Sequence, residues 1–265
     1  SYKFNSKNQF YLFAGLGNKE PVRDDYLNST PSTRPDAESM IDYEAGYKFT
    51  GTKLTATVNG YYMDYQNQLI LTGNINDVGE YIRENVKDSY RAGVEIEFGY
   101  SISKKLALNS NLTLSENKIK VYNEFTYDYD IDGLRMNSYN NTTISFSPSV
   151  ISSAELTYSP FKTLRLSTNI KYVGQQFLDN TSNENSILES YFLSNLSGSF
   201  SPSIKGLKGI EFKFMLNNIF GEKYSSNGYT FSDYSSNQRT EYNYYYPQAG
   251  ANWMAGVVVR FSLIL

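Results

Sequence analysis

Residues 90–100, YRAGVEIEFGY, decide the fold. The even-numbered positions of this stretch are all apolar or aromatic, whereas the odd-numbered positions hold one arginine, two glutamates and two glycines. Successive side chains of a β-strand point to opposite faces, so this period of two predicts a strand with one apolar and one charged face. Tyr90 and Tyr100 place an aromatic ring at each end of the apolar row.

The same alternation recurs along the chain, for example in residues 164–172, LRLSTNIKY. It predicts about ten strands, near residues 8–17, 39–50, 53–66, 88–102, 105–119, 148–159, 163–175, 189–202, 208–219 and 251–263. The apolar face is expected to carry Leu166, Ile170, Val94, Phe98, Phe214 and Val257. The opposite face is expected to carry Arg165, Lys171, Glu95, Glu97, Lys213 and Arg260.

The connections between these strands alternate in length. Short turns are expected at residues 50–52, 103–104, 160–162 and 204–207, and long loops at 18–38, 67–87, 120–147, 176–188 and 220–250. This alternation is typical of bacterial outer-membrane barrels, whose turns face the periplasm and whose loops face outside. The sequence therefore predicts an all-β fold, an antiparallel transmembrane β-barrel of meander strands.

A soluble β-sandwich is the alternative fold, because it also alternates apolar and polar residues. Two features disfavour it. The predicted strands often reach ten residues or more, whereas strands average about five or six. Aromatic residues also mark the ends of the apolar rows, as expected for rings at the two membrane interfaces. This lipid-facing girdle is expected to include Trp253, Phe261, Tyr90 and Tyr100.

Composition excludes several classes of function. The 265 residues include 25 tyrosines and 16 phenylalanines but neither cysteine nor histidine. Disulfides, thiolate nucleophiles and a Ser-His-Asp arrangement are therefore impossible within the chain, and neither an enzyme, nor a cofactor, nor a metal site is expected. A net charge of −3 offers no basic face for nucleic acid. Residues 1–265 show no domain boundary and are expected to form a single domain.

Several segments resemble one family, the TonB-dependent outer-membrane receptors. Residues 216–224 (LNNIFGEKY) and 245–253 (YYPQAGANW) resemble the final hairpin of these receptors, although Asn252 and Trp253 stand where an arginine and an aromatic residue often occur. Residues 35–47 (PDAESMIDYEAGY) and 89–95 (SYRAGVE) are similar to two earlier barrel strands of the family, and 172–181 (YVGQQFLDNT) looks like members from Bacteroidetes. The resemblance covers nearly the whole chain.

The resemblance implies a 22-stranded barrel in the outer membrane of a Gram-negative bacterium, filled by a plug and energised through TonB. Its implied partners are outer-membrane lipid, the remaining barrel strands, the plug, the TonB system and a small-molecule nutrient. The resemblance leaves four candidates for that nutrient: an iron-siderophore complex, haem, cobalamin or an oligosaccharide. Ten strands are under half of such a barrel, and the family's plug and TonB box precede it. We therefore expect a C-terminal barrel portion without plug or TonB box, in which residues 8–17 and 251–263 do not pair with each other.

Two other functions stay open at this stage. A small closed barrel could be a passive porin, or an enzyme with Asp128, Asp130 and Asp132 in its mouth. For a receptor, the candidate ligand contacts lie in the tyrosine-rich segment 221–250, with a second loop as a possible partner. They are Tyr242, Tyr244, Tyr245 and Tyr246, together with Tyr127 and Tyr129. Packing of these rings within the loops or in the girdle is the competing interpretation.

Overall fold

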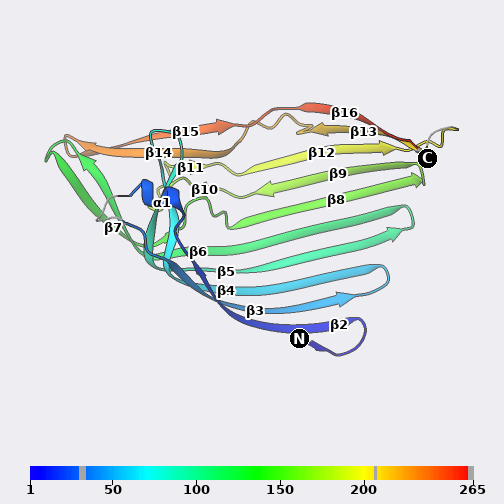
Figure 1. Cartoon of the computed structure of the whole chain (residues 1–265), viewed down its shortest axis with the longest axis horizontal. Coiled ribbons are helices and arrows are strands. Elements are labelled where there is room, and N and C mark those ends of the chain that lie inside the picture. The colour runs from blue at the N-terminus through cyan, green and yellow to red at the C-terminus, as the bar shows by residue number, and fades with distance from the viewer. Residues whose placement is uncertain (30–33, 206–207, 262–265) are drawn as a thin grey trace.

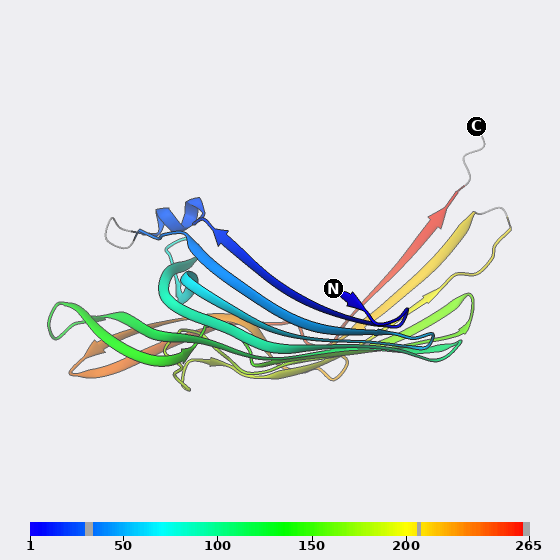
Figure 2. The same cartoon turned by 90° about the horizontal axis from the view of Figure 1, so that it is seen from below.

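The computed structural model describes residues 1–29, 34–205 and 208–261, most of which belong to one curved, open sheet (Figures 1 and 2). Its main strands are β2 (Asn8–Lys19), β3 (Glu38–Thr50), β4 (Leu54–Ile75), β5 (Tyr81–Ser103), β6 (Leu106–Asp128), β8 (Val150–Phe161), β9 (Leu164–Val173), β12 (Tyr191–Phe200), β13 (Gly209–Asn217) and β16 (Asn252–Arg260). They follow one another as antiparallel neighbours in that order, with the short β1 (Tyr2–Lys3) beside β2. The all-β meander expected from the alternation is confirmed.

The sheet does not close on itself. Strand β16 pairs with β13 from Asn252↔Asn217 to Arg260↔Gly209, as expected, although residues 262 and 263 of the expected last strand lie outside the described residues. At the other edge, β2 pairs with β3 and β1, and within the described ranges no pairing joins β2 to β16. The chain is therefore part of a larger barrel and not a closed ten-stranded one.

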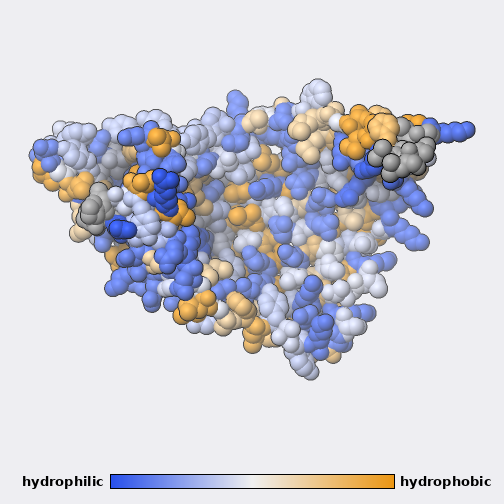
Figure 3. Space-filling model, in the orientation of Figure 1, coloured by the Kyte–Doolittle hydropathy of each residue, from blue (hydrophilic) through white to orange (hydrophobic). Residues whose placement is uncertain are grey.

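The two faces of the sheet separate as the alternation predicts. One row of directly paired residues crosses five strands as Ala45, Gly60, Val94, Leu114 and Val150. The neighbouring row on the other face runs through Gly46, Asn59, Glu95, Thr113 and Ile151. Figure 3 looks onto the concave face, where hydrophilic residues spread across the strands. The apolar rows consequently belong to the convex face.

The short turns lie at one end of the sheet, called here the turn end, and the longer connections at the other, the loop end (Figure 1). Three predicted turns are confirmed at 51–53, 104–105 and 162–163. The fourth, at 204–207, is described only as far as residue 205.

The predicted long loops are largely wrong, because most of them continue as strand. Strands β4 and β5 extend so far that residues 76–80 alone connect them, and segment 120–147 contains the end of β6 and β7 (Gly133–Thr143). Segment 220–250 contains β14 (Ser225–Ser235) and β15 (Gln238–Pro247). The other two loops hold α1 (Arg23–Leu27) and a small bridge of β10 (Gln176–Phe177) with β11 (Ile187–Leu188). These segments are rich in residues that are depleted in strands, which hid the hairpins.

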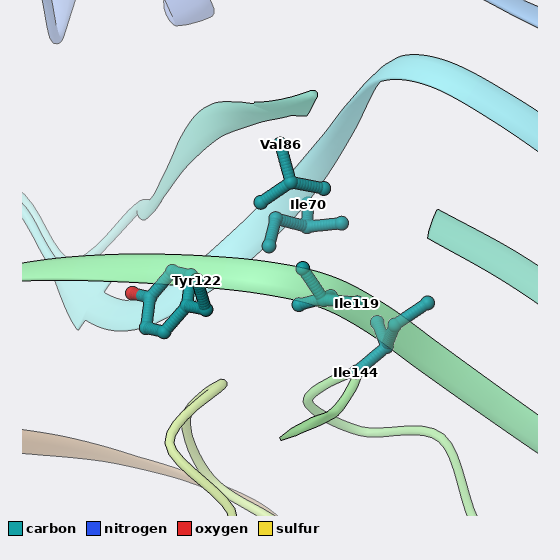
Figure 4. Packing of buried hydrophobic residues seen from close by; sticks show 5 residues of the cluster. All are labelled: Ile70, Val86, Ile119, Tyr122 and Ile144. Atoms are coloured by element: carbon teal, nitrogen blue, oxygen red, sulfur yellow. The ribbon is translucent and has the colours of Figure 1, made fainter. Parts of the chain in front are cut away.

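The buried hydrophobic cluster lies at the loop end, where the β4–β5 hairpin bends. Asn67 has a positive φ of 52°, and beyond it Ile70 and Val86 pack against Ile119, Tyr122 and Ile144 (Figure 4). Figure 2 shows the hairpin rising on the concave side of the sheet. Among the described residues, no helix is long and apolar enough to cross a membrane.

Candidate ligand-binding region at the loop end

Two hairpins join at the tip of the loop end. Strand β6 pairs with β7 on one side and, in parallel, with β14 on the other, through Tyr127↔Asp233 and Asp128↔Tyr234. The hairpins β6–β7 and β14–β15 therefore form one four-stranded extension (Figure 1). Its tip is fastened by Asp130, whose carboxylate accepts the backbone N–H groups of Ser236 at 2.9 Å and Asn237 at 2.6 Å. These two hydrogen bonds lower the pKa of Asp130.

Ion pairs join the two hairpins below the tip. The guanidinium of Arg239 on β15 donates to both carboxylate oxygens of Glu124 on β6, at 2.5 and 2.9 Å, and lies 3.2 Å from Glu241. The side chains of Arg239 and Glu124 are only 16% and 12% exposed. Burial and the charge of Glu124 raise the pKa of Tyr139 to about 12. A bidentate pair of this kind holds both partners in one geometry, so the extension is expected to be rigid.

One face of the β14–β15 hairpin is aromatic. Tyr229 and Phe231 of β14 lie directly opposite Tyr244 and Tyr242 of β15. The rings of Tyr229 and Tyr244 stack at a centroid distance of 4.8 Å, and Tyr229 lies 5.9 Å from Tyr246. This set of five, the aromatic face, is exposed enough at Phe231, Tyr242, Tyr244 and Tyr246 to touch a solute.

The expected partner loop lies beside this hairpin. The rings of Tyr127 and Tyr129 meet edge to face at 5.0 Å, and the hydroxyl of Tyr127 donates to Asp132. The pairing of Tyr127 with Asp233 makes the two hairpins neighbours there. The charge of Asp233 is the main cause that raises the pKa of Tyr242. Because residues alternate, Tyr245 points to the opposite side of β15 from Tyr242 and Tyr244. The structure thus brings five of the six predicted tyrosines near one surface and separates Tyr245 from them.

The sequence alone missed several residues of this region. Tyr229 and Phe231 complete the aromatic face, and the ion pair of Glu124 with Arg239 holds it in place. Residues 228–232, GYTFS, alternate aromatic and small residues, and this pattern indicates a strand with Tyr229 and Phe231 on one face.

The four predicted girdle residues lie on the apolar face or in line with it. Tyr90 stacks on Tyr62 at 5.7 Å, and Tyr100 lies 6.3 Å from Phe98. Trp253 is 67% exposed and pairs with Leu216 on the apolar face, and Phe261 follows the end of β16. That these rings contact lipid stays a prediction.

These features together define a class of protein. An open antiparallel sheet with one apolar and one polar face, tight turns at one end and long hairpins at the other is a section of the wall of a transmembrane β-barrel. The model of the family described as TonB dependent receptor-like, beta-barrel matches residues 1–219. The chain belongs to this family.

Solved structures of receptors share the fold. The siderophore receptor PiuA from Acinetobacter baumannii is similar with a TM-score of 0.70 and 16% identity, over 97% of this chain and 34% of the receptor. The ferric-catecholate import receptor Fiu from E. coli is similar with a TM-score of 0.64 and 15% identity, over 97% of this chain and 33% of the receptor. The ferric yersiniabactin uptake receptor FyuA from Yersinia pestis has a TM-score of 0.66 and 14% identity, over 97% of this chain and 35% of the receptor. A comparison with curated protein sequences gave no match.

The chain therefore spans about a third of the receptors it resembles in structure. Barrels of this family are outer-membrane proteins of Gram-negative bacteria, and they are receptors and transporters, not enzymes. The expectation that the chain is not an enzyme agrees with this membership. The closed small barrel, as porin or as enzyme, is wrong because the sheet is open.

Proposed function

We propose that this chain forms part of the barrel wall of a TonB-dependent receptor that imports a scarce nutrient across the outer membrane. The open sheet with one apolar and one polar face carries this proposal. In the complete receptor the convex rows through Val94 and Phe214 face lipid, with Tyr90, Tyr100, Trp253 and Phe261 at its two interfaces. The concave face, with Glu95 and Arg165, lines the lumen beside the plug, and TonB acts through the part that precedes this wall.

The aromatic face, with Tyr127 and Tyr129 beside it, contributes to capture of the nutrient. Binding residues concentrate on loops that a rigid scaffold positions, and tyrosine offers a large contact area at a small cost in side-chain entropy. The support is geometric. The ion pair of Arg239 with Glu124 and the backbone bonds to Asp130 hold the rings in place before any ligand arrives.

An iron-siderophore complex is the first candidate nutrient. The three receptors described above are named for siderophore or ferric-chelate uptake, and another similar structure is named a copper transporter. Haem, cobalamin and an oligosaccharide stay as alternatives, since aromatic and amide side chains also suit their faces and edges.

The capture proposal is tested on the full-length receptor with a triple variant of one face. Tyr242→Ala, Tyr244→Ala and Tyr246→Ala together remove the β15 half of the aromatic face, whereas Tyr245→Ala removes a tyrosine from the opposite side of the same strand. Affinity for a panel of ferric siderophores, haem, cobalamin and oligosaccharides is measured with the purified receptor. The triple variant is expected to bind its nutrient at least tenfold more weakly, and Tyr245→Ala close to the wild type. Equal losses in both variants, or none in the triple variant, would contradict the proposal.

Folding and import are measured separately. Heat-modifiable gel migration reports barrel assembly, which both variants are expected to keep, because the changed residues lie outside the wall strands. Growth of a strain lacking the gene, on each nutrient as the limiting source, tests import. Growth that is independent of the gene on every nutrient of the panel would contradict import of those nutrients.

A further inference from the structure

A cleft opens where β6 and β14 separate. The two strands pair only over Tyr127–Asp233 and Asp128–Tyr234, and below this point they diverge. A cavity of about 330 Å³ lies in the gap, a volume at the lower end of the range for small-molecule sites. Its walls come from β6 and β14, with further contributions from the β4–β5 hairpin, β7 and residue 179.

The cavity contains three carboxylates, from Glu84, Glu124 and Asp179. Glu124 has its counterion in Arg239, which also lies against Glu241. Glu84 accepts a hydrogen bond from the hydroxyl of Tyr122 at 2.9 Å, and Asp179 accepts two from Thr181, at 2.7 and 2.9 Å. Within the described ranges neither Glu84 nor Asp179 forms an ion pair, although Asp179 is only 6% exposed. Burial raises the pKa of both groups, and the negative charge of Glu124 raises it further.

Thr126 supplies an independent sign that the cavity is built for a ligand. Its side chain lines the cavity, the residue is 3% exposed, and its hydroxyl Oγ1 has no hydrogen-bond partner in the described structure. Buried hydroxyls are nearly always hydrogen-bonded, because an unsatisfied one loses its bonds to water without replacement. A ligand in the cavity that offers a donor or an acceptor would satisfy it.

The remainder of the lining is apolar and aromatic. Phe125 and Tyr127 of β6, Leu134 of β7 and Phe231 of β14 all line the cavity and are 38–64% exposed. An acidic interior beside aromatic rings suits a positive charge carried on an apolar body, since carboxylates pair with the charge and ring faces attract it. A bare metal ion fits less well, because no group of three acidic ligands with metal-binding geometry occurs in the described part of the chain.

We propose that this cleft between β6 and β14 binds an organic cation, an ammonium group attached to an apolar or aromatic body. The ammonium lies between Glu84 and Asp179 and donates a hydrogen bond to Thr126, and the apolar body lies against Phe125 and Phe231. The site requires only the fold of the loop end, so it does not depend on import of any nutrient.

The test uses the purified full-length receptor and a matched pair of probes. Phenethylammonium carries the charge, and 2-phenylethanol has nearly the same shape without it. Titration calorimetry is expected to show saturable binding of phenethylammonium and at least tenfold weaker binding of 2-phenylethanol, since hydrogen bonds to charged groups are the stronger ones. Equal affinity for the two probes, or no saturable binding of the ammonium, would overturn the proposal.

Three variants locate the site. Asp179→Asn and Glu84→Gln keep an oxygen acceptor for Thr181 and Tyr122 but remove the negative charge. Each is expected to lower the affinity for phenethylammonium about tenfold. Thr126→Val keeps the shape of the side chain but removes the unpaired hydroxyl, and it is expected to lower the affinity for phenethylammonium severalfold. The control is Asp77→Asn, an exposed carboxyl in the β4–β5 turn, which is expected to bind as the wild type does.

Folding of each variant is confirmed by heat-modifiable migration. If Asp179→Asn does not assemble, Glu84→Gln and Thr126→Val still decide the question. Unchanged affinity for phenethylammonium in these folded variants, or an equal loss in Asp77→Asn, would show that binding occurs elsewhere.

Discussion

The wall strands and the loop-end hairpins are both antiparallel β-structure, but different interactions stabilise them. In the wall, apolar side chains such as Leu166, Val94 and Phe214 are 40–43% exposed on a single layer of sheet. Within the described residues no second layer of the chain covers them. We expect lipid to cover them in the complete receptor. At the loop end, Ile119 and Leu178 are 0% exposed, covered by the chain itself.

Polar contacts differ in the same way. Arg165 and Glu155 form a wall ion pair at 3.5 Å with side chains 62% and 39% exposed, whereas the Arg239–Glu124 pair at the loop end is largely buried. In the wall, the same alternation of apolar and polar side chains repeats from strand to strand. The loop end is instead stabilised by individual contacts between particular residues. Substitutions should therefore act on the two regions separately.

The largest effect is expected at Arg239. Replacing it with methionine leaves Glu124 and Glu241 buried without a counterion, which costs about 3–5 kcal/mol. Hydrogen exchange of the intact receptor should show fast exchange in β14 and β15 and unchanged exchange in the wall strands. The double variant Arg239→Met and Glu124→Leu is the control and should recover much of the protection. Slow exchange in the single variant would mean that the ion pair does not hold the hairpins together.

The next effect belongs to the wall. Val94 lies near the middle of the apolar row between Tyr90 and Tyr100, so Val94→Arg should cost about 2–4 kcal/mol in the membrane. Glu95→Gln, one residue away on the polar face, is the matched control and should cost far less. Urea unfolding in lipid vesicles measures both. Similar costs for the two variants would contradict the assignment of the convex face to lipid.

The regularity of the wall is the reason that it could be predicted from sequence. The alternation around Val94 and Leu166 assigns each residue to a face without any knowledge of the partner strands, and the structure agrees. The loop end could not be predicted in this way. The parallel pairing of Tyr127 with Asp233 joins residues more than a hundred positions apart, and nothing local to either residue specifies it.

The candidate site was predictable only in part. The density of tyrosine pointed to segment 221–250 and to Tyr127 and Tyr129 as neighbours, and the structure places the two hairpins side by side. The exclusion of Tyr245 from the aromatic face required the strand β15, which was expected to be loop. The contact between Glu124 and Arg239 is equally invisible in sequence, because a charged residue in a polar segment ordinarily points to solvent.

A third and smaller effect is expected at Asn180, which joins separate segments of the loop end. Its buried side chain accepts the N–H of Ser145 at 2.8 Å and donates to the carbonyl of Leu71 at 2.7 Å. Asn180→Ala leaves the N–H of Ser145 without its partner, at a cost of about 1–3 kcal/mol, whereas the carbonyl of Leu71 still accepts from the hydroxyl of Ser145 at 2.8 Å. The amide of Ser145 should then exchange faster, while Asn185→Ala, an exposed position in the same loop, should leave it unchanged. An unaltered rate for Ser145 in the Asn180 variant would show that water replaces the side chain without loss.

The smallest effect is expected at Arg165, and it completes the comparison because both regions contain an Arg–Glu pair. Arg165 and Glu155 remain well exposed, so water already solvates both charges and their attraction is weak. Exposed pairs of this kind contribute about 0–1 kcal/mol. Arg165→Gln should therefore change the free energy of unfolding little, and a double-mutant cycle with Glu155→Gln should give a coupling within that range that shrinks at high salt. The same cycle on Arg239 and Glu124 should give a larger coupling that salt hardly changes, because ions do not reach a buried pair. Equal couplings for the two pairs would mean that burial is not what distinguishes the loop end from the wall.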